Sequence, residues 1–172
     1  MAAFEKIKSG IEQMDAALDY IRLGDNVVWQ VDTIDTFLKF ALPYVQQAVR
    51  DRRNLIYIRF AEHPAFLEEG PGVKVYRVDP EERFELFTVK IHEIIAREGR
   101  DAFYLFDCLS DLQVAWSTDL MMGNFFRVTC PYLFELDTVA FFPILRGHGV
   151  SNPDSRANYH FKLNHDRKRE II

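Results

Sequence analysis

The chain has 172 residues, of which 48% are hydrophobic and 27% are charged, and this content suits one globular domain and excludes disorder over most of the length. Its formal net charge of -5 gives no general attraction to nucleic acid or to an anionic membrane, so we expect neither as a partner. The first nine residues lack the apolar core of a secretion signal, and no apolar run approaches the ~18 residues that span a bilayer, so we expect a cytoplasmic protein.

The first predicted element is an amphipathic helix. Ser9 is a candidate N-cap, and Glu12, three residues later, can close a capping box. Apolar residues follow at helical spacing as far as Ile21, and residues 22–25 are expected to end the helix. The next apolar run, 26–31, is rich in β-branched residues, which indicates a buried strand.

Helices and strands continue to alternate along the chain. The further predicted strands are residues 55–60, 73–78, 102–107 and 138–142. The further predicted helices are residues 33–52, 81–98 and 110–135, the last with candidate interruptions at Gly123 and Pro131. This alternation favours a mostly parallel sheet covered by helices on both faces.

The chain becomes polar after Arg146. We therefore divide it into an α/β domain, 1–146, and a polar tail, 147–172. In the tail, Tyr159, Phe161 and Leu163 alternate with polar residues and mark a candidate edge strand. The basic run 167–169 is too short to indicate nucleic-acid binding.

Several short motifs follow one another in a familiar order. They are Ser9-Gly10-Ile11 with Met14-Asp15, Leu18, Gly24 and Val27-Val28; Glu62 behind the second strand; and Phe103 to Asp107, continued by Cys108-Leu109-Ser110-Asp111-Leu112. Together they resemble the RecA superfamily, especially its KaiC-like branch, in which the last motif would be a Walker B strand. Residues 101–145 also resemble the inactivated RecA-like domain of bacterial proteins related to phosphoenolpyruvate synthase and pyruvate phosphate dikinase.

The resemblance covers roughly residues 9–145. It implies a three-layer RecA-like P-loop NTPase fold with a mostly parallel central sheet. RecA-like domains generally assemble side by side, so it also implies a homo-oligomer or another protein partner. The chain has no room for the phosphotransfer domains of the dikinase relatives, so their chemistry is not carried over.

The phosphate-binding loop is missing from the place where it should stand. A P-loop needs glycines, a lysine and a hydroxyl residue to surround phosphates and hold Mg²⁺. The degenerate loop here consists of Asp32, Thr33, Asp35 and Thr36 around Ile34, without glycine or lysine. Like charges at 4 Å repel by about 1 kcal/mol in water and about 4 kcal/mol at an effective dielectric near 20, so we expect no bound nucleotide cofactor. Asp32 or Thr33 would instead cap the following helix.

Four acidic residues are expected near the carboxyl ends of the strands, where ligands collect in open α/β sheets. They are Asp32, Asp35, Glu62 and Asp107. Because Mg²⁺ and Ca²⁺ prefer oxygen ligands, the four are a candidate metal site. The alternative is that Asp32 and Asp35 are caps, while Glu62 and Asp107 are relics held by hydrogen bonds.

The histidines and cysteines give weaker indications. His63 is a candidate base or ligand, although a loop histidine before a proline is most often a surface residue. His92, on the helix 81–98, is expected to be structural. Cys108 and Cys130 lie outside any CxxC spacing, which indicates buried free thiols rather than a disulfide or a zinc site.

Three functions follow from these patterns. The leading one is a non-catalytic, inactivated RecA-like ATPase module that serves signalling or regulation through protein contacts, with no catalytic residues and no cofactor. The second is a weak ATPase or kinase-like enzyme with ATP and Mg²⁺ as cofactors, in which Asp107 holds the metal and Glu62 activates the nucleophile. The third is a binder of a small molecule or cation at the strand ends.

Overall fold

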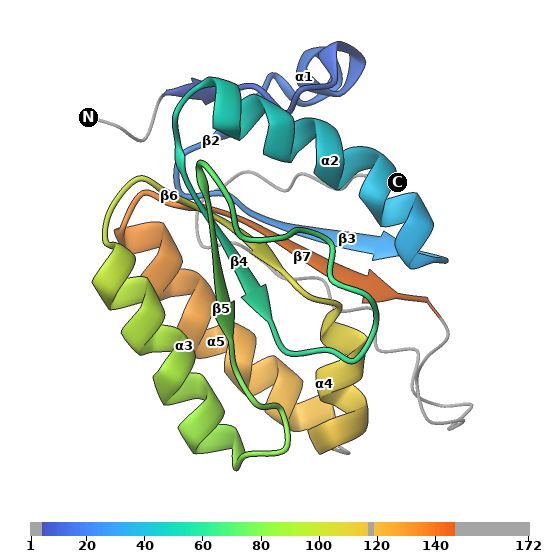
Figure 1. The fold of residues 1–172 in the computed structure, drawn as a ribbon, viewed down its shortest axis with the longest axis vertical. Helices are drawn as coiled ribbons and strands as arrows, with labels where there is room; N and C mark the ends of the chain where they lie inside the picture. The colour runs from blue at the N-terminus through green and yellow to red at the C-terminus, as the bar shows by residue number, and fades with distance from the viewer. Residues whose placement is uncertain (1–4, 117–118, 147–172) are drawn as a thin grey trace.

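The computed structural model describes residues 5–116 and 119–146 and shows a three-layer α/β fold (Figure 1). The central sheet has five strands in the order β3-β7-β6-β4-β5, and every neighbouring pair is parallel. The strands are β3 (Asn26–Val31), β4 (Asn54–Arg59), β5 (Val73–Arg77), β6 (Ala102–Phe106) and β7 (Val139–Leu145). The predicted fold class is confirmed, and the architecture is consistent with a three-layer RecA-like domain.

Helices cover both faces of the sheet. The helix α2 (Ile34–Arg50) lies on one face, and α3 (Phe84–Glu98), α4 (Leu109–Trp116) and α5 (Asp119–Glu135) lie on the other (Figure 1). The short helix α1 (Glu12–Leu18) and the antiparallel strands β1 (Lys6–Ile7) and β2 (Ile21–Arg22) lie on the α2 side. Among the described residues, we find no helix that is long and apolar enough to cross a membrane.

The core consists of two apolar layers, one on each face of the sheet. Successive residues of a strand point to opposite faces, so Tyr104 and Phe106 pack toward α3 and α5, whereas Phe103 and Leu105 pack toward α2. Aromatic rings fill much of both layers. On the α2 side, the rings of Tyr44 and Phe141 stack with their centroids 3.9 Å apart.

The prediction of the first helix was wrong at both ends. The N-cap residue of α1 is Ile11, without a side-chain cap, while the Ser9 hydroxyl accepts a hydrogen bond from the Ile11 amide. The helix ends at Leu18, because Asp19 and Tyr20 both have positive φ angles. Ile21 is buried as predicted, but from strand β2, so its helical spacing was misleading.

The last predicted helix is two helices, α4 and α5. The candidate interruptions at Gly123 and Pro131 were wrong, because both residues lie within α5. The other predicted element boundaries agree with the structure to within three residues, and those of β3 agree at both ends. The tail, including its candidate strand and the basic run, lies outside the described residues.

Candidate functional site

Strand β3 passes into helix α2 through Asp32 and Thr33 alone. Thr33 is the N-cap of α2, and its hydroxyl accepts a hydrogen bond from the Thr36 amide at 3.2 Å. The hydroxyls of Thr33 and Thr36 also lie 3.0 Å apart. The turn therefore uses its own hydroxyl to satisfy the helix N-terminus and has no loop that could surround a phosphate.

We expect Thr33→Ala to destabilise the protein by about 1 kcal/mol, because it removes the only side-chain cap of α2 among the residues described. Thr33→Ser keeps the acceptor oxygen and should lie within about 0.5 kcal/mol of the parent protein. Urea denaturation followed by circular dichroism measures both. Equal stability of the alanine and serine variants would show that the cap contributes nothing.

The carboxylate of Asp107, directly behind β6, is the centre of a buried polar network. Its side chain is 0% exposed, and its Oδ2 atom accepts hydrogen bonds from the backbone amides of Phe60 at 2.9 Å and Ala61 at 2.8 Å. The guanidinium of Arg59 donates to the same oxygen at 3.1 Å, and the Tyr57 hydroxyl donates to Oδ1. The charge is thus paired and its oxygens are occupied by donors, as a buried carboxylate requires.

The same network fixes the segment that follows β4. The Tyr57 hydroxyl accepts a hydrogen bond from the Phe66 amide at 3.1 Å, and Arg59 also donates to the backbone carbonyl of His63. Burial, together with the hydrogen bond to Asp107, raises the pKa of Tyr57. Tyr57 therefore stays protonated and remains a hydrogen-bond donor to Asp107.

No protein-family model matches this chain, and no curated protein matches it either. The roles of these residues therefore rest on their geometry.

The four predicted acidic residues differ widely in their surroundings. Asp107 is enclosed, whereas Asp35 and Glu62 are exposed. Asp32 has a side chain that is 76% exposed and lies 3.9 Å from Arg146, in a weak surface ion pair. Within residues 5–116 and 119–146, no three His, Cys, Asp or Glu side chains form a group suited to a metal ion. The geometry favours the alternative interpretation of Asp107 as a residue held by hydrogen bonds.

His63 is not the surface residue that its place before a proline suggests, because its side chain lies next to Asp107. Its ring stacks on Phe66 with centroids 4.4 Å apart, and its Nε2 atom lies 3.4 Å from the Cys108 amide and 3.6 Å from Asp107 Oδ1. Its Nδ1 atom lies 2.8 Å from the carbonyl of Pro64. A tautomer with hydrogen on Nδ1 would satisfy both backbone groups. The contacts of His63 therefore help to hold the segment that follows β4 against Asp107.

The remaining candidates have structural surroundings. His92 lies between α3 and α5, with its Nε2 atom 3.1 Å from the Thr129 hydroxyl, and burial lowers its pKa. Both cysteines are free; Cys108 is buried and Cys130 is half-buried. Burial raises the pKa of Cys108 and raises that of Cys130 to about 12, so neither thiol is activated as a nucleophile.

Sequence reasoning missed Arg59 and Tyr57. Arg59 is the single charged residue in an otherwise apolar strand run, and a largely buried charge needs a partner of opposite sign. Asp107, at the end of another strand, was the available partner. The charge of Arg59 within the run was therefore the signal that could have predicted this pairing.

Proposed function

We propose that this chain is a non-catalytic, inactivated RecA-like module that serves signalling or regulation through protein contacts. The supporting observation is that the residues at both the phosphate-loop position and the Walker B-like position are already engaged in hydrogen bonds within the protein. Thr33 closes the turn where a phosphate loop would stand, and Asp107, at the Walker B-like position, is occupied by Arg59 and backbone amides.

Electrostatics also support this proposal. A nucleotide at the end of β3 would meet the exposed carboxylates of Asp32 and Asp35. The P-loop supplies most of the positioning and charge stabilisation in phosphoryl transfer, so a site without it loses the main catalytic contribution.

The enzyme alternative requires Asp107 to hold Mg²⁺. A metal ion there would have to displace Arg59 or the two amide donors from the carboxylate. Glu62 is exposed and therefore accessible as a base. The Asp107 carboxylate, by contrast, already accepts hydrogen bonds from Tyr57 and Arg59. The geometry therefore favours the non-catalytic module over the weak ATPase.

We expect a fluorescent ATP analogue with Mg²⁺ to show no saturable binding at micromolar protein concentrations, measured by fluorescence anisotropy. Glu62→Gln, at an exposed position, serves in a parallel assay of phosphate release. Micromolar binding, with phosphate release that Glu62→Gln abolishes, would contradict the proposal and support the ATPase. Light scattering gives the molar mass of the full chain in solution and so tests the predicted homo-oligomer. The same measurement on the chain co-purified with bound proteins tests the prediction of another protein partner.

A further inference from the structure

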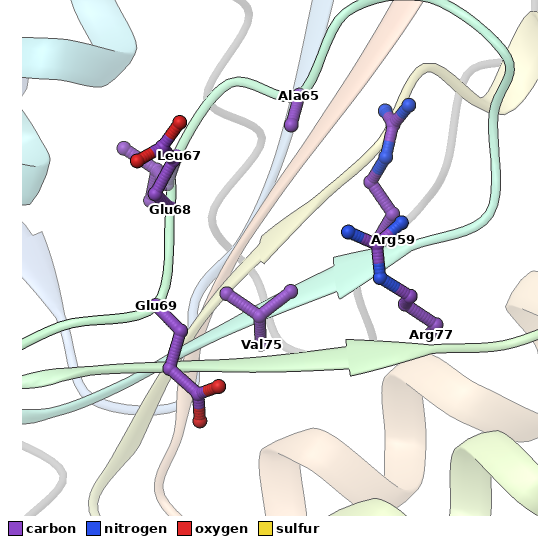
Figure 2. Close-up of a pocket in the computed structure, with 7 residues that line it drawn as sticks. All are labelled: Arg59, Ala65, Leu67, Glu68, Glu69, Val75 and Arg77. Carbon is purple, nitrogen blue, oxygen red and sulfur yellow. The ribbon is translucent and has the colours of Figure 1, made fainter.

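A pocket of about 510 Å³ lies between edge strand β5 and the segment that leads into it (Figure 2). Its volume falls in the range of roughly 300–1,000 Å³ that is typical of small-molecule sites. The lining residues are Arg59, Ala65, Leu67, Glu68, Glu69, Val75 and Arg77. None of the four acidic residues of the predicted strand-end site lines this pocket, which adjoins that site through Arg59, the partner of Asp107.

One end of the pocket is cationic. Arg59 and Arg77 are register partners on the parallel strands β4 and β5, so their side chains leave the sheet on the same face. The charge of Arg59 is already balanced by Asp107, which also holds the guanidinium in place. Arg77 is exposed, and its side chain has no hydrogen-bond or ion-pair partner among the described residues. This end therefore offers one uncompensated positive charge.

The other end is anionic. Glu68 and Glu69 are exposed, and neither carboxylate has a partner within the described part of the chain. Figure 2 shows both carboxylates on the opposite side of Val75 from the two guanidinium groups, with the Glu68 carboxylate above strand β5 and the Glu69 carboxylate below it. Val75 lies between the two charged ends, and Leu67 lies beside Glu68, so both supply apolar lining (Figure 2).

We propose that this pocket binds a small zwitterion, with a carboxylate at the arginine end, an ammonium group at the glutamate end and an apolar chain between them. A single free positive charge matches a carboxylate better than a doubly charged phosphate. A guanidinium also forms strong charge-assisted hydrogen bonds with carboxylates. A purely anionic ligand would be opposed by the two glutamates, and a purely cationic one by Arg77. The proposal does not depend on whether the module is catalytic.

The probe is ε-aminocaproate, an amino acid whose two charges are separated by an apolar chain. Titration of the isotope-labelled full chain, followed by two-dimensional NMR, should give saturable shifts centred on the amides of Leu67 and Val75. Caproate lacks the ammonium group and hexylamine lacks the carboxylate, so each should bind about tenfold more weakly. Equal shifts with all three compounds, or no saturable shift with the zwitterion at millimolar concentration, would overturn the proposal.

Variants at exposed positions test which charged group of the ligand lies at each end of the pocket. Arg77→Gln should weaken ε-aminocaproate binding about tenfold and leave the weak binding of hexylamine unchanged or stronger. The double variant Glu68→Gln/Glu69→Gln should have the opposite selectivity and favour caproate. Arg50→Gln, at an exposed position at the end of α2, is the matched control and should bind like the parent chain. Unchanged zwitterion binding in Arg77→Gln would refute the assignment, and its spectrum also reports whether the variant is folded.

Discussion

Replacing Asp107 by alanine should destabilise the protein by about 3–5 kcal/mol, the range for breaking a buried ion pair by removing one partner. The variant leaves the Arg59 guanidinium, whose side chain is only 13% exposed, without its counter-charge. It also leaves the amides of Phe60 and Ala61 and the Tyr57 hydroxyl without their acceptor. Equilibrium urea denaturation gives the change in the free energy of unfolding.

Two controls separate this network from a general effect of removing an acid. Asp32→Ala, which removes an exposed carboxylate in a weak surface pair, should change stability by no more than about 0.5 kcal/mol. The double variant Asp107→Ala/Arg59→Met should recover part of the loss, because it also removes the unpaired charge. If Asp107→Ala lies within about 1 kcal/mol of the parent protein, Asp107 is not the structural centre that we describe.

The alternation of apolar runs predicted the central architecture well. The run 26–31 coincides with β3, an edge strand that is half buried. The run 102–107 contains β6, whose five residues are all buried, because a central strand covered by helices on both faces is apolar throughout. Strand order and the pairing of β7 between β3 and β6 could not be predicted, because they depend on contacts between segments distant in the sequence.

The prediction failed where local pattern and tertiary pairing disagree. Ile21 stands at helical spacing from Leu18, yet it pairs with Ile7 in the β1–β2 ribbon. The spacing of apolar residues records that Ile21 is buried, but not whether a helix or a strand buries it. The helix ends at two residues with positive φ angles, Asp19 and Tyr20. Neither is a glycine, so no residue in the sequence signals that the helix ends there.

The candidate site was predicted in part. The loss of the phosphate-binding residues between β3 and α2 and a cap at Asp32 or Thr33 followed from the sequence, and the structure assigns the cap to Thr33. The enclosure of Asp107 did not follow, because strand-end position alone does not show which donors surround a carboxylate. Arg59 and Tyr57 reach it from the neighbouring strand, and only the parallel register of β4 and β6 brings them together.

Gly10→Ala should also be strongly destabilising and should lower the free energy of unfolding by about 4 kcal/mol. Gly10 has a φ angle of +84°, a left-handed conformation that costs an alanine about 1–3 kcal/mol. An added Cβ atom would also lie 2.3 Å from the carbonyl oxygen of Pro43 and 2.7 Å from its carbonyl carbon. Overpacking of this kind adds about 1–3 kcal/mol, and here the obstacle is helix backbone, which cannot rotate away.

Two other glycines separate the contributions of conformation and contact. Gly99 has a φ angle of +74°, and an added Cβ atom there would meet no other atom within 4 Å, so Gly99→Ala should show the conformational cost alone, about 1–3 kcal/mol. Gly70 has neither constraint, and Gly70→Ala should lie within about 0.5 kcal/mol of the parent protein. Thermal and urea denaturation of the three variants should therefore give the order Gly10, Gly99, Gly70. If Gly10→Ala costs no more than Gly99→Ala, the close approach to Pro43 does not contribute. If the order holds, the glycine of the Ser9-Gly10-Ile11 motif is required because it lets the N-terminal segment pack directly on the backbone of α2.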